Sequence, residues 1–187
     1  MLNKISNQDK VLNKYNFFLA KSLVSYTGKY RYFDSTNIEG VTAKIYFRKL
    51  FGKCFNRDDA FNEINHKLNY GYSLIVARIA CVVTNYGYLT EIGIKHHCDT
   101  NNLNFPYDLI EPFRQIVDDY VYRTIDVQFD YDYKANMLGI LKAPVHLNGE
   151  KAINLDDAIP IYISNCIRFL DNNESSYTEI TYWKNAV

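Results

Sequence analysis

The chain has 187 residues, of which 48% are hydrophobic and 22% are charged, a balance that fits one globular domain with a real core. No run of about 18 or more apolar residues is present, which excludes a typical membrane-spanning helix. The net charge is zero, but residues 1–90 are basic, with 13 Lys and Arg against 6 Asp and Glu, and residues 91–187 are acidic, with 8 Lys and Arg against 15 Asp and Glu. The basic first half could follow a phosphate backbone. The alternative is that both halves simply carry solvated charged faces.

Helical periodicity dominates the start of the chain. Over about Lys4–Ser25, apolar residues recur at the spacing of a helix. Residues 34–36 (Asp-Ser-Thr) offer N-cap oxygens for a second helix over Ile38–Phe51, and Gly52 is expected to end it.

The third predicted helix is the longest, from about Ala60 to Asn85. Residues 57–59 are expected to cap it and Gly87 to stop it. Its second half, from Leu74 to Val82, is apolar almost throughout. Because a helix that is apolar on most sides is normally buried, we expect this one at the centre of the molecule.

The second half of the chain alternates polar segments with shorter elements. A polar segment over Lys95–Asn104 is followed by predicted helices at about Tyr107–Tyr122, Asp132–Lys142 and Ala158–Leu170, the last of them capped by residues 156–157. Between the last two helices, Asn148-Gly149 separates residues 145–147 from 152–153, which is typical of a hairpin turn. The sequence thus predicts a mainly α fold with a small β-hairpin near the C-terminus.

The spacing of the cysteines and the first residues of the sequence indicate in which cellular compartment the protein is expected. The cysteines at positions 54, 81, 98 and 166 lack the close pairing of a zinc site, so we expect reduced thiols. The start, MLNKISNQDKV, has no apolar signal region, and a cytoplasmic location is expected.

Glu39 shares the apolar face of its predicted helix. On a 3.6-residue period Tyr46 and Leu50 follow it along that face, while Lys44 and Arg48 point the opposite way. A carboxylate on an apolar face needs a cation or a hydrogen-bond donor to stay ionised, and a metal ion would supply one. The alternative is a first-turn glutamate that merely interacts with the helix dipole.

The stretch HHCDTNNLNFPYDLIEPFR, residues 96–114, offers further ligands. One of His96 and His97 can bind a metal through a neutral ring nitrogen, or both are surface residues. Adjacent residues rarely all reach one ion, so zinc binding by residues 96–99 is disfavoured.

Two carboxylates open the helix that follows. Asp108 and Glu111 are three residues apart and so lie on one face, although Asp108 is equally well explained as an N-cap. Two carboxylates and one imidazole, from Glu39, His96 and Glu111, would form an open site suited to Mg²⁺ or Mn²⁺.

Four stretches together resemble the CRISPR-associated protein 1 family, the integrases of CRISPR adaptation, and most closely its type II branch. They occur in the family's order and at its spacing, within a resemblance that covers about Lys4–Cys166. The stretches are Asn37–Phe51 (NIEGVTAKIYFRKLF), Leu68–Ser73 (LNYGYS), Gly93–His96 (GIKH) and Asn104–Arg114 (NFPYDLIEPFR).

The resemblance implies a helical catalytic domain in which Glu39, His96 and Glu111 are the catalytic metal ligands. Glu111 fills a position that is Asp in some branches, and Asp108 matches an acidic position just outside the ligand set. His96 is preferred over His97 because the spacing from Gly93 to His96 reproduces the family's Gly-to-His spacing.

The resemblance also implies a reaction and partners. A DNA 3′-hydroxyl would attack a phosphodiester of the repeat array and insert a new spacer, and water as the attacker would give endonuclease activity. The implied partners are double-stranded DNA (spacer precursor and CRISPR repeat), a CRISPR-associated protein 2 subunit and a second copy of the chain. Tyr70 and Tyr72 either position DNA ends or pack in the core. Candidates for phosphate contact are Lys44, Arg48, Arg78 and Arg114.

Members of the family carry a β-rich domain before the helical part, and we expect that domain to be absent here. The expected organisation is a lead-in helix over residues 1–30, a metal-dependent catalytic domain over 31–172 and a polar tail over 173–187. Two rival hypotheses remain: a non-catalytic DNA-binding or scaffolding subunit of the same fold, and a transposon-borne integrase relative.

Overall fold

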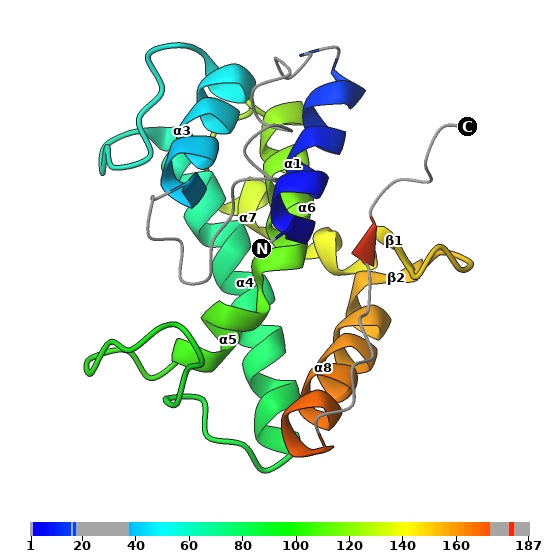
Figure 1. Ribbon diagram of the computed structural model, residues 1–187. Coiled ribbons are helices and arrows are strands. Elements are labelled where there is room, and N and C mark those ends of the chain that lie inside the picture. The colour runs from blue at the N-terminus through cyan, green and yellow to red at the C-terminus, as the bar shows by residue number, and fades with distance from the viewer. Residues whose placement is uncertain (1, 16, 18–37, 173–179, 182–187) are drawn as a thin grey trace.

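The computed structural model describes residues 2–15, 17, 38–172 and 180–181 (Figure 1). Over this part of the chain the helices are α1 Leu2–Lys14, α3 Ile38–Phe51, α4 Glu63–Asn85, α5 Asn104–Leu109, α6 Arg114–Arg123, α7 Tyr131–Met137 and α8 Leu155–Asn172. The same residues form the short 3₁₀ helices η1 Glu111–Phe113 and η2 Leu138–Lys142, and the strands β1 Pro144–Leu147, β2 Ile153–Asn154 and β3 Ile180–Thr181. The predicted mainly α fold with a small hairpin is confirmed.

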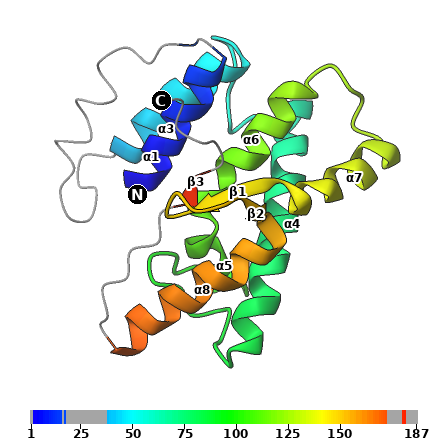
Figure 2. The same ribbon diagram turned by 90° about the vertical axis from the view of Figure 1, so that its right-hand side faces the viewer.

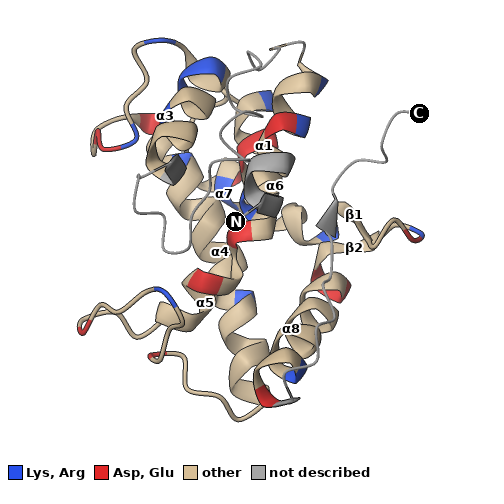
Figure 3. Ribbon diagram, viewed as in Figure 1, with Lys and Arg blue, Asp and Glu red and all other residues tan. Residues whose placement is uncertain are grey.

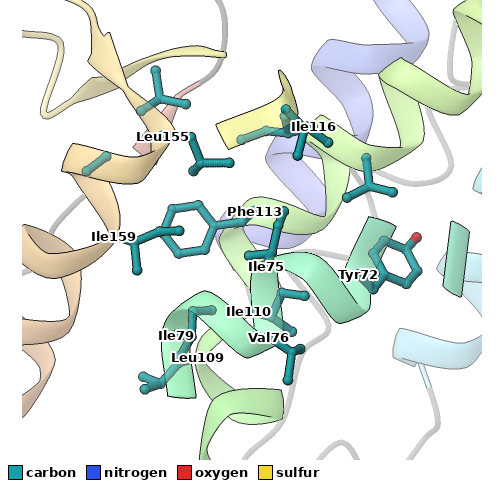
Figure 4. Packing of buried hydrophobic residues seen from close by; sticks show 14 of the residues in the cluster. Tyr72, Ile75, Val76, Ile79, Leu109, Ile110, Phe113, Ile116, Leu155 and Ile159 are labelled. Carbon is teal, nitrogen blue, oxygen red and sulfur yellow. The ribbon is translucent and has the colours of Figure 1, made fainter. Parts of the chain in front are cut away.

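α4 runs through the centre of the molecule, and α5, α6 and α8 pack along it (Figure 1). In the close view of Figure 4, Ile75 of α4 lies near Phe113 of η1, with Leu155 and Ile159 of α8 on the far side of that ring. Full burial of a side chain of this kind contributes about 1.5–3 kcal/mol. This apolar core confirms the central place predicted for α4, whose buried apolar residues are Leu68, Tyr72, Ile75, Val76, Ile79, Val82 and Val83.

The start of α4 lies three residues later than predicted. Asn62 is the N-cap, and its side-chain oxygen accepts the backbone N–H groups of Ile64 (2.9 Å) and Asn65 (3.4 Å). Residues 57–59 lie before the cap, so their predicted capping role was wrong. Gly87 follows the helix with a φ of +81°, a conformation that favours glycine, and the predicted stop is confirmed.

The predicted helix Tyr107–Tyr122 is divided into α5, η1 and α6. Pro112 has no backbone N–H, and its ring crowds the carbonyl four residues earlier in an α-helix, which favours the interruption seen here. The predicted helix Asp132–Lys142 is likewise divided into α7 and η2. At the start of the chain, α1 ends at Lys14, before the expected end at Ser25, and residues 18–37 lie outside the described part.

Gly71 allows α4 to approach α6 and α7 closely. A Cβ atom at this position would lie 2.4 Å from Cγ1 of Val117 and 2.6 Å from Cε of Met137. Val117 and Met137 would have to shift to accommodate any side chain here. The glycine within LNYGYS is therefore explained by helix packing.

The hairpin turns at Asn148-Gly149, as predicted, with φ angles of 50° and 75°. The backbone N–H of Glu150 donates to the oxygen of Leu147 and closes the turn. A regular ladder from this turn would pair Val145 with Ala152. Val145 instead pairs with Ile153, so the β2 side of the hairpin contains one extra residue. β3 was not predicted: the segment Ile180–Thr181 pairs antiparallel with β1 and completes a sheet of order β2-β1-β3.

α8 begins at Leu155, three residues before the prediction. Asp156 and Asp157 lie in its first turn rather than at a cap, where they interact favourably with the positive end of the helix dipole.

α1 lies beside α3 and α6 at the other end of the molecule (Figures 1 and 2). A small apolar cluster joins these helices, formed by the buried Val11 and Leu12 of α1 and Tyr46 and Leu50 of α3. None of the helices in the described ranges is both long enough and apolar enough to cross a membrane.

Candidate active site

α3 has the bounds that were predicted for it, Ile38–Phe51, and Glu39 lies in its first turn. The structure describes the backbone of Glu39 but not its side chain. Further along the same face, Tyr46 and Leu50 are buried, whereas Lys44 and Arg48 are exposed. The predicted orientation of α3, with the Glu39 face inward, is confirmed for these four side chains.

α5 fixes the polar loop that carries His96. Asn104 is buried, and its side-chain N–H groups donate to the backbone oxygens of Glu91 (3.0 Å) and Cys98 (2.9 Å). One helical turn later, Asp108 accepts the backbone N–H groups of Ile94 (2.6 Å) and Lys95 (2.9 Å) through Oδ2. Two side chains of one short helix thus hold both ends of the loop.

Asp108 also orients the His96 imidazole. The Nδ1 atom of His96 lies 2.6 Å from Oδ1 of Asp108. An ionised carboxylate beside Nδ1 requires a proton on Nδ1, which leaves Nε2 of the neutral ring to accept a metal or a proton. The suggestion that Asp108 is a helix N-cap was wrong, because Asp108 lies near the end of α5 and binds the preceding loop.

The loop needs a glycine three residues before His96. A Cβ atom at Gly93 would lie 2.2 Å from the backbone oxygen of His96 and 3.0 Å from Oδ2 of Asp108. The Gly93-to-His96 spacing therefore has a steric cause: the backbone folds back on itself around the Asp108 carboxylate. His97 is exposed, and its side chain forms no hydrogen bond or ion pair with the described residues.

Glu111 is held by a cation of its own helical segment. The Nε atom of Arg114 donates to Oε1 of Glu111 at 2.9 Å, and both side chains are mostly buried. Burial is the largest influence and disfavours the charged Arg114 guanidinium, but Glu111, Tyr72 and Asp118 together outweigh burial and raise the pKa of Arg114. The pair fixes one oxygen of Glu111 in a part of the molecule that is shielded from water.

A buried carboxylate, that of Asp118, lies one helical turn after Arg114 on α6. Asp118 accepts hydrogen bonds from the hydroxyl of Tyr46 on α3, at 2.9 Å, and from the hydroxyl of Tyr72 on α4. Burial raises the pKa of Asp118 to about 6, although both hydrogen bonds and the nearby Arg114 and Arg57 favour the ionised form. Burial beside this carboxylate also raises the pKa of both tyrosines, so both remain protonated donors.

These groups surround a cavity of about 270 Å³ between α1, α3, α4 and α6. The guanidiniums of Arg57 and Arg114 lie 5.6 and 4.9 Å from the centre of the Tyr72 ring. The buried amide of Gln115 has no hydrogen-bond partner among the described residues, an arrangement that costs about 1–3 kcal/mol per polar group. The cavity therefore brings two cations and two carboxylates together, and its lining residues are Gln8, Ala43, Phe47, Arg57, Tyr72, Glu111, Arg114, Gln115 and Asp118.

The remaining candidates for phosphate contact differ in their surroundings. Lys44 and Arg48 are exposed on α3, and Figure 3 shows further Lys and Arg residues at the end of α3 and in the loop that follows. Arg78 forms an ion pair with Asp156 and so joins α4 to α8. The hydroxyl of Tyr70 donates to the backbone oxygen of Lys134 (3.4 Å), and Tyr72 is buried, so both tyrosines pack within the fold.

The donor set fits a divalent cation by its chemistry: two carboxylates and an imidazole are ligands that Mg²⁺ or Mn²⁺ accepts. Within the described residues no three His, Cys, Asp or Glu side chains converge as a metal site. Because the Glu39 side chain lies outside those residues, the ligand set Glu39, His96 and Glu111 stays a prediction.

Sequence reasoning did not single out Asp118, Tyr46 or Gln115. The available signal was an acidic pair, Asp118-Asp119, placed between the apolar Val117 and Val121 of one helix. Both carboxylates are buried in the structure, and buried carboxylates require donors from other elements.

Comparisons with known proteins identify the family of the chain. Residues 2–138, well over half of the chain, match the family model for the CRISPR associated protein Cas1. The CRISPR-associated endonuclease Cas1 of Neisseria meningitidis serogroup C (strain 8013) is 38% identical over 116 residues, a match that covers 62% of this chain and 38% of that protein.

Two solved structures share the fold. A casposase bound to integration product has a TM-score of 0.73 at 21% identity, covering 93% of this chain and 58% of that one. A Cas1 protein from Thermotoga maritima has a TM-score of 0.72 at 15% identity, covering 92% of this chain and 65% of that one. The chain thus spans less than two thirds of the length of each of these relatives.

Proposed function

The chain belongs to the Cas1 family of CRISPR-associated endonucleases, and from this premise we propose that it cuts and joins DNA phosphodiesters with a divalent metal ion. The observation that carries the proposal is that two of the predicted ligands are each held in place by a neighbouring side chain. Asp108 binds Nδ1 of His96, and Arg114 binds Oε1 of Glu111. Both restraints lie in stretches that match the family.

Glu39, His96 and Glu111 would hold the ion, with Nε2 of His96 as the nitrogen ligand. The chemistry that a bound divalent ion supplies is polarisation of the scissile phosphate and stabilisation of charge on the leaving oxygen. Asp108 keeps the His96 ring in the tautomer that presents Nε2. Arg114 offers its remaining N–H groups to a phosphate oxygen, and Lys44 and Arg48 contact the DNA backbone further along α3.

In the adaptation reaction proposed here, a DNA 3′-hydroxyl attacks the repeat array and the new spacer is joined. Double-stranded DNA, a CRISPR-associated protein 2 subunit and a second copy of the chain are the proposed partners. An integrase of a mobile element is the second candidate, because the casposase structure has a similar fold. A CRISPR array beside the gene would favour the first candidate and its absence the second.

The test is a strand-transfer and nicking assay with Mn²⁺ on a branched DNA substrate. The unmodified chain is expected to be active, and Glu39→Ala, His96→Ala and Glu111→Ala are each expected to lose activity while remaining folded by circular dichroism. Full activity of Glu111→Ala would contradict the assignment of the ligands. If the unmodified chain is folded but as inactive as the three variants, the scaffolding role is favoured.

A further inference from the structure

Asp118 joins three helices that carry or border the predicted ligands. It lies on α6 and is buried, and its two oxygens are divided between two other helices. Oδ2 accepts the hydroxyl of Tyr46 on α3, and Oδ1 accepts the hydroxyl of Tyr72 on α4. The partners lie 72 and 46 residues away in the sequence, so these contacts hold elements that have no local connection.

One branch of this network leads to Glu111. The ring of Tyr72, whose hydroxyl binds Asp118, lies beneath the Arg114 guanidinium at 4.9 Å from the ring centre. The Nε atom of Arg114 in turn donates to Glu111. Attraction between a guanidinium and an aromatic face fixes the height of the cation above the ring, so the position of the Tyr72 ring limits where Glu111 can lie.

The other branch leads to α3. Tyr46 is seven residues after Glu39, which places the two positions on one face of α3, two turns and about 10 Å apart along the axis. A helix of 14 residues moves as a unit over such a length. The Tyr46–Asp118 hydrogen bond therefore restrains how far α3 can slide or rotate relative to α6, and with it the first turn of α3.

We propose that Asp118 is a positioning residue that aligns Glu39 on α3 with Glu111 on η1, through Tyr46 on one side and through Tyr72 and Arg114 on the other. This inference rests on the proposed function, because it assigns a role toward the metal ligands suggested there. Asp118 lines the same cavity as Glu111, and in this role it acts through Tyr46, Tyr72 and Arg114 rather than as a ligand of the ion.

The carboxylate is better suited to this role than a neutral side chain. Two hydroxyl donors need two acceptors, and each oxygen of Asp118 accepts one. An asparagine would present one acceptor and one N–H donor, so one tyrosine would have to reverse its hydrogen bond. The negative charge also lies near the guanidiniums of Arg57 and Arg114, which an asparagine would no longer attract.

The next residue is a matched control. Asp119 is as deeply buried as Asp118 on the same helix, but it binds Lys14 (2.6 Å), the Tyr15 hydroxyl (2.7 Å) and Arg123 (3.0 Å). Those contacts fasten α1 to α6 and do not include Tyr46, Tyr72 or Arg114. A general effect of removing a buried carboxylate should therefore be equal at the two positions, whereas a positioning effect should be confined to Asp118.

The experiment measures Mn²⁺ binding to the full chain by electron paramagnetic resonance, without DNA, for the unmodified protein and for Asp118→Asn, Tyr46→Phe, Asp119→Asn and Glu111→Ala. Loss of a residue that orients a ligand typically weakens metal binding by about 10–100-fold. We expect such a loss in Asp118→Asn, a smaller loss in the same direction in Tyr46→Phe, and Mn²⁺ affinity within about twofold of the unmodified protein in Asp119→Asn. Excess Mn²⁺ should restore strand transfer to Asp118→Asn but not to Glu111→Ala.

The outcomes separate this inference from the function on which it rests. If Glu111→Ala loses Mn²⁺ while Asp118→Asn binds it as the unmodified protein does, the positioning role is wrong and the metal site stands. If the Asp118 and Asp119 variants weaken binding equally, the effect is one of general stability and the positioning role is again wrong. If the unmodified protein binds no Mn²⁺, or Glu111→Ala binds it normally, the metal site fails and the inference fails with it. If Asp118→Asn does not fold, Tyr46→Phe, which removes a single hydroxyl, provides the test: Mn²⁺ affinity equal to that of the unmodified protein would contradict the positioning role.

Discussion

On one side α6 buries Ile116, Val117 and Val121 in the large apolar core. On the other side it presents the carboxylates of Asp118 and Asp119 to polar groups of α1, α3 and α4. Apolar packing is strong and non-directional, so many arrangements of similar volume satisfy it. Hydrogen bonds to a buried carboxylate are directional and costly to leave unmade. The comparison suggests that the apolar side mainly provides stability and that the polar side mainly provides alignment.

The largest effect on stability is expected on the apolar side. Ile79 of α4 is fully buried in the core, and Ile79→Ala removes apolar contacts and leaves a cavity. Such substitutions typically cost about 2–5 kcal/mol. Urea unfolding should show this loss, while Mn²⁺ affinity of the folded protein remains unchanged. A large change in Mn²⁺ affinity would show that the two sides of α6 are not independent.

A pH dependence is expected from the polar side. Burial raises the pKa of Asp118 from 3.8 to about 6, so between these values the folded protein binds more protons than the unfolded chain. Stability contributed by this group is therefore present below pH 4 and is lost as the pH rises to about 6, by on the order of 3 kcal/mol. Urea unfolding from pH 4 to 7 should show a decline that is smaller in Asp118→Asn, and equal declines in both proteins would contradict the prediction.

A smaller loss is expected for Asp119→Asn. The variant removes the charge that Lys14 and Arg123 bind, but both cations are partly exposed and solvent replaces much of the interaction. A cost of about 1–2 kcal/mol is expected, with earlier exchange of the α1 amides in hydrogen-exchange measurements. Protection of α1 at the level of the unmodified protein would show that its apolar contacts suffice.

The smallest effect is expected for His97→Ala, next to the predicted ligand. His97 is exposed, whereas Asp108 binds the ring of His96. Both stability and strand transfer should stay within about twofold of the unmodified protein, since exposed substitutions away from special contacts rarely matter. An inactive His97→Ala together with an active His96→Ala would reverse the assignment of the two histidines.

Local patterns in the sequence were sufficient for the elements with local causes. The bounds of α3, the stop at Gly87 and the turn at Asn148-Gly149 depend on neighbouring residues and were predicted. The division of the helix at Pro112 also has a local cause, but the apolar periodicity continues through it and favoured one helix. β3 could not be predicted, because its pairing with β1 joins distant segments.

The same distinction applies to the candidate site. His96, Asp108 and Glu111 were recognisable as polar residues in a suggestive order, and the Asp108–His96 contact crosses only 12 residues. The roles of Asp118 and Tyr46 depend on contacts across 72 residues, which no local pattern contains. The side chain of Glu39 lies outside the described part, so its place in the site remains a prediction.

The polar contacts of α1 have a consequence for how the chain folds during synthesis. Lys14 and Tyr15 bind a carboxylate that lies 105 and 104 residues later, on α6. At a translation rate of about 5–20 residues per second, α1 leaves the ribosome about 5–20 s before that partner is made. During this interval the apolar face of α1 and the Tyr46 face of α3 can pack against each other but not yet against α6. Within this part of the chain, α1 and α3 are therefore accessible to chaperones until α6 has been made.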